Sequence, residues 1–339
     1  MKPQMAATLP TDPTPHHRLS LENIGSAVDL IDPVFLGSPQ YDCEPLSDRL
    51  GCALTLKVET ANPIRSFKGR GASFLIRQRA ASGALRGRRI VGASAGNWGQ
   101  ALAYACRARD LPLVLYAATA ANPLKVARMR ALGAEVRLHG ADFDAAKAEA
   151  AAFAHASGGL MLADGFDPEA AEGAGTIAVE LMAEPVRPDC IVVPLGNGAM
   201  LTGIARWAKA VAPQTEIVGV QATGADAMEK SWRSGRLIFP SSIATIADGI
   251  AVRVPIAEAV ADMQGLVDDV QLVDDVTIVA AMRLLFDQAG LLTEPSGAVG
   301  VAAIMSRPET FRGKRVAVII CGGNLTRQDF ETWLTRLPT

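Results

Sequence analysis

The sequence lacks a cysteine pattern that would support disulfides or a metal site. Its cysteines are odd in number and scattered, and no two stand at a spacing typical of metal ligands. This pattern fits a protein in a reducing compartment, so we expect a cytoplasmic location and no disulfide framework. The five cysteines are Cys43, Cys52, Cys106, Cys190 and Cys321.

An excess of one charge and a long apolar run are also missing. The 33 Lys and Arg residues nearly balance the 35 Asp and Glu residues, so the net charge is −2. This balance predicts no nucleic-acid partner and no membrane surface, and no apolar run reaches the length of a spanning helix. Residues 1–18 contain no apolar segment of the signal-peptide kind. We expect a poorly ordered tail over residues 1–20.

What the sequence does contain is a regular alternation of short apolar runs and longer amphipathic ones. Such an alternation predicts parallel sheet covered by helices, an α/β fold. With 339 residues, 49% of them hydrophobic, the chain is long enough for two compact lobes. A less regular segment is expected over residues 235–254. The predicted strands are 54–58, 89–92, 113–116, 135–138, 190–193, 216–220 and 315–320. The predicted helices are 68–81, 97–109, 123–132, 141–156, 168–182, 200–212, 225–234 and one from about residue 328.

One stretch, Ser66-Phe67-Lys68-Gly69-Arg70-Gly71-Ala72, places a single lysine between an aromatic residue and glycines. Glycine allows backbone and ligand to approach closely. The stretch therefore suggests that Lys68 carries a bulky group. Because most lysines are solvated surface charges, the other motifs have to support this interpretation.

Two more stretches lie between a predicted strand and a predicted helix, where parallel sheets bind their ligands. Residues 94–100 begin with Ser94, which can cap the following helix, and this turn suits a carboxylate. Residues 194–200 expose successive N–H groups at a helix start, which suits a phosphate. The second stretch lacks the features of a nucleotide P-loop and of the dinucleotide fingerprint. The phosphate is therefore expected to belong to something other than ATP or NAD.

Three later motifs complete the set: Asp248-Gly249-Ile250-Ala251-Val252, Glu294-Pro295-Ser296-Gly297-Ala298 and Cys321-Gly322-Gly323-Asn324. Two glycines in the last motif permit a flat group to lie against the backbone. In their order and rough spacing, these motifs resemble fold-type II pyridoxal-phosphate enzymes. They look most like the serine/threonine dehydratase group, which also includes serine racemase. The resemblance covers about residues 30–330. It implies a fold like that of tryptophan synthase β, with two lobes that each contain a mostly parallel sheet flanked by helices.

The resemblance also implies pyridoxal 5′-phosphate as the cofactor and a role for each matching residue. Lys68 would form the Schiff base and then remove the substrate α-proton. Phe67 and Gly249 would lie beside the ring, and Asn97 would hydrogen-bond the ring hydroxyl. The expected cofactor contacts are Phe67, Lys68, Asn97, Gly196, Asn197, Gly198, Ala199, Met200, Gly249, Glu294 and Cys321. The expected contacts to the substrate carboxylate are Ser94, Ala95, Gly96 and Asn97.

Two of these positions bear on the reaction type. By the resemblance, Cys321 stands against the pyridine nitrogen, and a neutral partner there favours elimination over transamination. Ala95 stands where racemases of the group carry a serine that acts on the face opposite the lysine. Because alanine cannot transfer a proton, one-sided chemistry is expected.

Departures from the family pattern bear on metal binding and on the substrate. Gln221 and Ala227 replace the two carboxylates of the members that bind divalent cations, so no metal site is expected. Trp98 replaces a commoner histidine and narrows the substrate side of the pocket. The resemblance also implies a homodimer, a large lobe (residues 21–84 and 166–339) and a small mobile lobe (residues 85–165).

The leading interpretation is the β-elimination of a hydroxy amino acid, such as L-threonine or L-serine, to a 2-oxo acid and ammonia. A β- or γ-replacement enzyme, or a threonine-synthase-like enzyme acting on a specialised amino acid, is the alternative. A third hypothesis is a protein that binds pyridoxal phosphate without catalysis. The identity of the substrate and the dimer interface stay open at this point.

Overall fold

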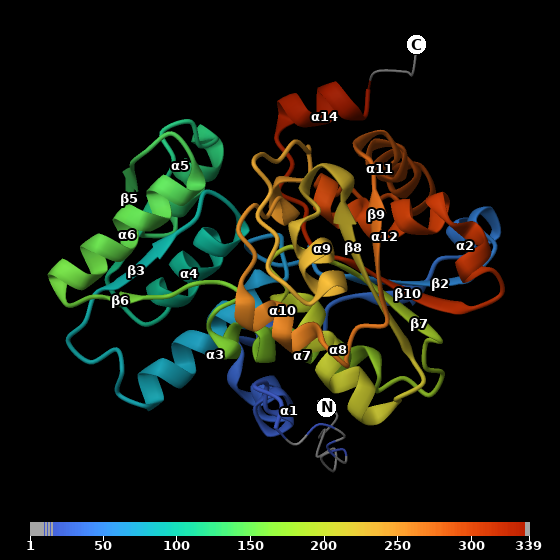
Figure 1. The fold of residues 1–339 in the computed structure, drawn as a ribbon, viewed down its shortest axis with the longest axis horizontal. Coiled ribbons are helices and arrows are strands. Elements are labelled where there is room, and N and C mark those ends of the chain that lie inside the picture. Colours follow the sequence, from blue (N-terminus) through green and yellow to red (C-terminus); the bar gives the residue numbers. More distant parts are fainter. Residues whose placement is uncertain (1–9, 11, 13, 15, 336–339) are drawn as a thin grey trace.

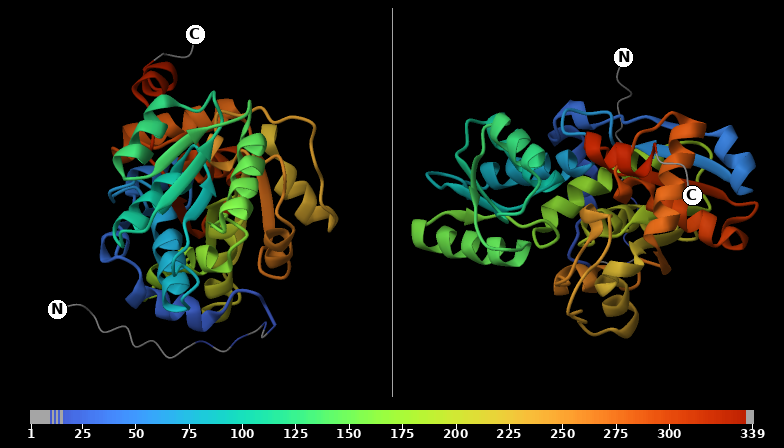
Figure 2. Two further views of the ribbon diagram at one scale, coloured as in Figure 1. Left: turned by 90° about the vertical axis from the view of Figure 1, so that its left-hand side faces the viewer. Right: turned by 90° about the horizontal axis from the view of Figure 1, so that it is seen from above.

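The structure, a computed structural model, describes residues 10, 12, 14 and 16–335. These residues form two sheets with helices packed on their faces (Figure 1). The smaller sheet, with its helices, stands beside the larger one in Figure 1 and in the view from above (Figure 2). The α/β fold with sheets of mostly parallel strands is therefore confirmed. The boundaries of the two lobes stay a prediction.

The larger sheet has six strands in the order β1-β2-β10-β7-β8-β9. The last strand of the chain, β10, lies parallel between β2 and β7, and only β1 runs antiparallel to its neighbour. The predicted strands that belong to this sheet agree with the observed bounds within two residues. The strands are β1 (Gln40–Asp42), β2 (Ala53–Val58), β7 (Cys190–Pro194), β8 (Glu216–Ala222), β9 (Asp269–Val273) and β10 (Arg315–Ile320).

The smaller sheet has four parallel strands in the order β5-β4-β3-β6. Alternate residues of β4 point to opposite faces: Leu113 and Leu115 pack toward α4 and α5, whereas Val114 and Tyr116 pack toward α6. The strands are β3 (Ile90–Ala93), β4 (Leu113–Ala117), β5 (Glu135–Leu138) and β6 (Leu160–Met161). The helices are α4 (Asn97–Arg107), α5 (Pro123–Ala131) and α6 (Phe143–Ser157).

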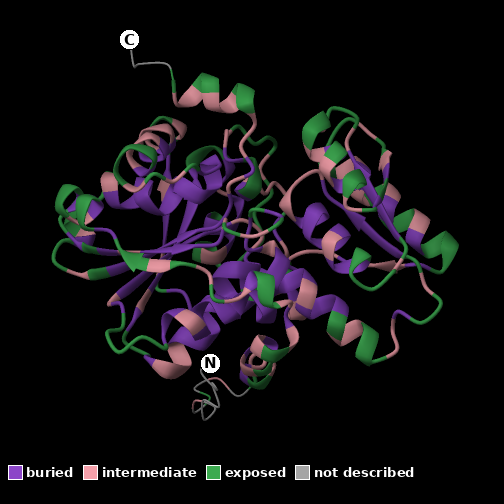
Figure 3. Cartoon of the chain, turned by 180° about the vertical axis from the view of Figure 1, so that it is seen from behind, coloured by how far each residue is buried: buried purple, intermediate pink, exposed green. Residues whose placement is uncertain are grey.

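Helices cover both faces of the larger sheet, so its strands are among the most buried parts of the molecule (Figure 3). Helices α1, α7, α8 and α10 pack on one face, and α2, α11, α12 and α13 pack on the other. Helix α3 lies between α4 and α7. The helices are α1 (Leu21–Leu30), α2 (Glu44–Leu50), α3 (Lys68–Ala81), α7 (Pro168–Leu181), α8 (Ala199–Val211), α9 (Ala227–Ser234), α10 (Ala257–Met263), α11 (Asp275–Ala289), α12 (Pro295–Ser306), α13 (Pro308–Phe311) and α14 (Arg327–Trp333). The short 3₁₀ helices are η1 (Pro33–Phe35), η2 (Thr223–Ala225) and η3 (Asp248–Ile250).

A buried ion cluster ties α3 to α7 and β2. The guanidinium of Arg70 is fully buried and donates to Glu59 at 2.8 Å and to Glu180 at 2.7 Å. Lys57, buried on β2, also donates to Glu180, at 2.6 Å. Thr176 on α7 accepts a further hydrogen bond from Arg70 at 3.0 Å. Arg70 lies two residues after Lys68 on α3, and the cluster fixes that helix against the rest of the fold.

The tail predicted over residues 1–20 is described only in part, since residues 1–9, 11, 13 and 15 lie outside the described residues. Within the described part, Arg206 on α8 donates to the carbonyl of Leu19 at 2.9 Å. Arg18 pairs with Asp262 on α10 at 2.5 Å. Residues 18 and 19 are therefore bonded to the body of the fold.

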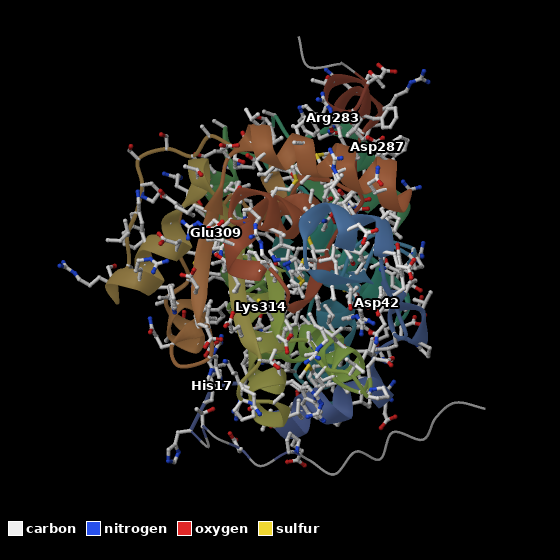
Figure 4. The ribbon with its side chains drawn as sticks, turned by 90° about the vertical axis from the view of Figure 1, so that its right-hand side faces the viewer. His17, Asp42, Arg283, Asp287, Glu309 and Lys314 are labelled. Atoms are coloured by element: carbon white, nitrogen blue, oxygen red, sulfur yellow. The ribbon has the colours of Figure 1, made fainter. Side chains whose placement is uncertain are left out.

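The side of the molecule away from the smaller sheet carries charged residues from β1, α11, α13 and the segment before β10 (Figure 4). The residues labelled there do not line the cavity described below. Within the described residues, no helix combines the length and apolar character needed to cross a membrane. The labelled residues are His17, Asp42, Arg283, Asp287, Glu309 and Lys314.

Candidate active site

A cavity of about 620 Å³ lies at the carboxyl ends of strands from both sheets. The turns that follow β3, β6 and β7 line it, together with the start of α3 and parts of segment 241–256. In parallel sheets this edge is where ligands bind.

The cavity brings together all but one of the predicted site residues. Ala199 is the exception, and its N–H donates to the side-chain oxygen of Asn197 at 3.2 Å. The predicted residues that line the cavity are Phe67, Lys68, Ser94, Ala95, Gly96, Asn97, Gly196, Asn197, Gly198, Met200, Gly249, Glu294 and Cys321.

Lys68 is the first residue of α3, and its amine reaches into the cavity. The preceding residue, Phe67, donates its N–H to the carbonyl of Cys321 at 3.0 Å, which fixes the start of α3 to the end of β10. The Lys68 Nζ lies 4.6 Å from the centre of the Phe67 ring. It also forms an ion pair with Asp164. The lysine is thus partly buried and held between an aromatic face and a carboxylate.

The glycines around Lys68 serve protein packing, which corrects the prediction that they make room for a ligand. A Cβ on Gly69 would overlap the ring of Phe35, and one on Gly71 would overlap the carbonyl of Ala170. Likewise, a Cβ on Gly322 would overlap the carboxylate of Glu294. These glycines let α3 and the end of β10 approach their neighbours closely.

The turn after β3 is closed by Ser94. Its hydroxyl accepts hydrogen bonds from the N–H groups of Gly96 at 3.1 Å and Gly99 at 3.0 Å. Gly99 belongs to the first turn of α4, so Ser94 caps this helix as predicted, although Gly96 occupies the N-cap position. The turn therefore presents small residues and a helix start to the cavity.

The N-terminus of α8 opens into the same cavity. Gly198, at the N-cap position, has a φ of 100°, a left-handed conformation that favours glycine. The N-cap glycine has no side chain that could cap the helix, and the first N–H group, that of Ala199, donates to the side-chain oxygen of Asn197 at 3.2 Å. The positive end of the helix dipole faces the cavity, and no carboxylate caps this helix start among the described residues.

Asn97 joins a polar network that crosses from the smaller sheet to the larger one. Its amide donates to Glu294 at 2.7 Å and accepts from the side chain of Asn324 at 2.8 Å. The N–H of Asn324 donates to Glu294 at 3.1 Å, and its side-chain oxygen accepts from Arg128 at 2.7 Å. This network determines the orientation of Asn97.

Glu294 is the most perturbed carboxyl group of the cavity. Burial, reinforced by the charge of Asp248, raises its pKa to about 7, although Lys125 and the hydrogen bonds from Asn97 and Asn324 act in the opposite direction. The folded protein thus binds the Glu294 proton more tightly than the unfolded chain does, whose ordinary value is 4.5. The contribution of the tightly bound Glu294 proton to the free energy of unfolding is full below pH 4.5 and is lost as the pH rises through about 7.

Glu294→Gln is therefore expected to flatten the pH dependence of stability in this window. A shift of this size corresponds to at most about 3 kcal/mol in the free energy of unfolding. Urea unfolding at pH 5 and pH 7.5, at one cofactor concentration, measures the difference. Glu331→Gln, at an exposed site, is the control. An unchanged pH dependence in Glu294→Gln would contradict this pKa.

Cys321 follows the last residue of β10 and faces the cavity. Burial, together with the charge of Glu294, raises the pKa of its thiol far above the ordinary value. The thiol is therefore neutral at physiological pH, although Lys68 lies close enough to oppose the shift. Within the described residues, none of the five cysteines forms a disulfide.

Sequence reasoning missed several cavity residues, above all Asp164. This residue follows β6, and the rule that ligands bind beyond strand ends would have drawn attention to it. However, β6 has only two residues, and no strand was predicted there. The other missed charged residues that line the cavity are Lys125, Asp142, Asp144, Lys147 and Arg253.

Two residues singled out as departures from the family pattern are buried. The indole of Trp98 lies at the cavity wall, and its Nε1 has no hydrogen-bond partner among the described residues. Gln221 on β8 accepts a hydrogen bond from the N–H of Glu229 at 3.1 Å. The absence of a metal ion stays a prediction.

Comparison with known proteins decides the family. The sequence pattern of the family described as "Pyridoxal-phosphate dependent enzyme" matches residues 31–322. The chain belongs to this family. Its members are enzymes that depend on pyridoxal phosphate, so the predicted cofactor and the predicted family are confirmed.

Curated relatives carry names of one kind. L-threonine ammonia-lyase of Thermotoga maritima is 33% identical over 307 residues, which cover 91% of this chain and 76% of that protein. The biosynthetic L-threonine dehydratase of Escherichia coli is 31% identical over 290 residues, which cover 85% of this chain. The match spans only 56% of the length of the dehydratase.

Solved structures extend the similarity to the whole fold. Maize serine racemase superposes with a TM-score of 0.86 at 27% identity, covering 93% of this chain and 98% of that one. The processed form of threonine deaminase isoform 2 from Solanum lycopersicum has a TM-score of 0.85 at 30% identity. That match covers 92% of this chain and 91% of the deaminase.

The cavity of this pyridoxal-phosphate enzyme fits the cofactor. The start of α8, which no carboxylate caps among the described residues, offers a positive dipole end and N–H groups to a phosphate, and Lys68 offers an amine. The buried hydroxyl of Ser296 has no partner among the described residues, and a Cβ on Gly249 would lie 2.6 Å from it. A phosphate group, an amine-reactive carbonyl and a flat polar ring therefore each have complementary groups here.

Proposed function

We propose that this enzyme catalyses the β-elimination of a hydroxy amino acid such as L-threonine or L-serine, and that the products are a 2-oxo acid and ammonia. One observation carries the proposal. The amine of Lys68 shares a single cavity with the helix start at Gly198 and with the turn after β3. The names of the threonine ammonia-lyase and dehydratase relatives support the same reaction.

The cofactor is held by both sheets in this proposal. Backbone N–H groups of residues 196–200 bind the phosphate, as the orientation of the α8 N-terminus favours. Phe67 and Gly249 would contact the ring, Asn97 would donate to the ring hydroxyl, and Cys321 would lie against the ring nitrogen. Lys68 would hold the cofactor until the substrate amine takes its place, and the cofactor would then withdraw electrons from the substrate Cα and weaken its C–H bond.

The chain's own residues then position the substrate and move one proton. The turn of Ser94, Gly96 and Asn97 binds the substrate carboxylate, while the amine of Lys68 removes the α-proton. Because the thiol of Cys321 is neutral, it places no negative charge next to the ring nitrogen. In this proposal, the neutral contact favours release of the β-hydroxyl over transamination.

Ala95→Ser tests whether the chemistry is confined to one face of the substrate. A serine at this position adds a hydroxyl that can exchange a proton on the face opposite Lys68. The variant is expected to form D-serine from L-serine at a rate clearly above that of the parent enzyme. Chiral chromatography measures the product, and Ala93→Ser, two residues earlier at the end of β3, is the control. A variant without D-serine above background would contradict the role given to position 95.

A replacement reaction is the second candidate, and Trp98 favours it. Its bulky indole at the cavity wall, with an unpartnered N–H, suits a specialised amino acid. Product analysis with and without an added thiol separates the two reactions. An eliminase releases 2-oxo acid and ammonia from L-threonine or L-serine without the thiol. Formation of a thioether amino acid, with no 2-oxo acid in the absence of thiol, would overturn the proposal.

The assembly and location belong to the same proposal. We propose a homodimer in the cytoplasm, and a small lobe over residues 85–165 that moves to close the site. The scattered cysteines and the resemblance to the family support this view. Light scattering of the purified protein gives the mass of the assembly and tests the dimer.

A further inference from the structure

The cavity contains five carboxyl groups, and only one of them is bonded to Lys68. The other four have different partners within the described residues. Asp142 caps α6 through the N–H of Ala145, Asp144 pairs with Arg253, Asp248 pairs with Lys125, and Glu294 accepts from Asn97 and Asn324. Asp164 is the carboxylate that meets the Lys68 amine.

The turn that carries Asp164 is fixed by the fold. Its next residue, Gly165, has a φ of 82°, and a Cβ there would lie 2.8 Å from Ile256 and 3.0 Å from Asn197. On the other side, the N–H of Ala163 donates to Asp167 at 2.9 Å. Arg79 in turn pairs with Asp167 at 3.0 Å. The position of the Asp164 carboxylate is therefore held by contacts on both sides of it.

We propose that Asp164 is a positioning residue that aims the amine of Lys68 and stabilises its protonated form during the elimination. This inference rests on the proposed function. Lys68 acts as a base by forming an N–H bond with the α-proton of the substrate, and its charge rises from 0 to +1. The carboxylate of Asp164 neutralises that charge at the position where it develops.

The proton and electrons of this step balance without a further reactant. The electron pair of the broken Cα–H bond forms the double bond between Cα and Cβ, and the Cβ–O bond breaks. The hydroxyl leaves as water after it receives the proton carried by Lys68. Lys68 returns to the neutral amine, and Asp164 keeps its charge throughout.

Other titratable groups around Lys68 define the background of a pH experiment. Cys321 at the end of β10 is a neutral thiol, because burial raises its pKa. Glu294 at the start of α12 changes its charge near pH 7, because burial raises its pKa to about 7. The charge change of Glu294 would overlap with the effect of Asp164 on the absorbance midpoint. We therefore include the Glu294→Gln background as a parallel series.

The test uses the enzyme loaded with cofactor and two readouts. The first is the pH midpoint at which the visible absorbance of the lysine-bound cofactor changes, which reports on protonation of the Lys68 nitrogen. An opposite charge in contact shifts such a midpoint by about 1–3 pH units. Asp164→Asn is expected to lower the midpoint by at least about 1 unit in both backgrounds. Asp164→Glu, which keeps the charge, is expected to restore most of the shift.

The second readout is the steady-state kinetics with L-threonine and L-serine. Asp164→Asn is expected to lower kcat by about 100-fold, because positioned proton transfer contributes on that order. Its KM is expected to stay within about threefold of the parent value, since Asp164 acts through Lys68 and not on the ground-state substrate.

Asp142→Asn is the matched control, because it removes one charge from the same cavity while asparagine still caps α6. It is expected to leave the absorbance midpoint unchanged. An Asp164→Asn midpoint equal to that of the parent, or a shift equal to that of Asp142→Asn, would overturn the inference. If no amino acid is deaminated, the proposed function fails, but the absorbance midpoint still tests the role of Asp164.

Discussion

Lys68→Ala is expected to lower the rate of 2-oxo acid formation by at least about 1,000-fold. The variant loses both the amine that attaches the cofactor and the base that moves the α-proton. These two roles act as a unit, so their loss removes the reaction as a whole. The fold is expected to remain, because Lys68 begins α3 and its side chain contributes to the cavity and not to a core cluster. A coupled assay with L-threonine and L-serine measures the rate.

Lys230→Ala is the control for this loss, because Lys230 lies on the surface in an ion pair with Asp226. It is expected to retain the parent rate. Circular dichroism of both variants checks that the helices are intact. A Lys68→Ala enzyme that kept more than about a tenth of the parent rate would contradict the assignment, because a positioned acid or base contributes at least about 100-fold to the rate.

Arg70→Met is expected to lower the free energy of unfolding by about 3–5 kcal/mol. The substitution leaves Glu59 and Glu180 without the guanidinium that bonds both of them. Removing one partner of a buried ion pair costs more than the pair itself contributes, because the remaining charge stays buried. Equilibrium unfolding in urea measures the change.

The same variant has a predicted pH signature. Burial alone would raise the pKa of Glu180, but the hydrogen bonds and charges of Arg70 and Lys57 lower it to about 2. The stabilisation is therefore full above pH 4.5 and is lost as the pH falls toward 2. Arg70→Met is expected to reduce this loss on acidification.

The control is Arg315→Met, because Arg315 forms an exposed pair with Asp189. Exposed pairs contribute about 0–1 kcal/mol, so this variant is expected to be nearly as stable as the parent. Equal losses of stability in the two variants would show that the buried cluster around Arg70 is not what fixes α3.

The sequence predicts much of this fold because its buried strands are short and apolar. Residues 190–193 and 316–320 are buried, so they appear as continuous apolar runs. The order of the strands in the sheet, by contrast, cannot be predicted from local sequence patterns. Strand β10 lies between β2 and β7, which come from distant parts of the chain, and no local pattern predicts that pairing.

Site residues that belong to a local sequence motif were predictable, whereas a site residue that is recognised only by its spatial contact was not. Lys68, Asn97 and Cys321 belong to motifs, and the cavity brings them together. Asp164 belongs to no motif, and its importance depends on a contact with a residue far away in the sequence. For Gly69 and Gly71 the prediction assigned a ligand role that the structure explains by packing. Their small size lets α3 approach Phe35 and Ala170.

The visible spectrum of the purified protein tests the central claim most directly. The account predicts an absorbance band typical of pyridoxal phosphate bound to a lysine, its loss in Lys68→Ala, and a change of the band on addition of L-threonine or L-serine together with release of 2-oxo acid. A parent protein without such a band, even after the cofactor is added, would contradict the account.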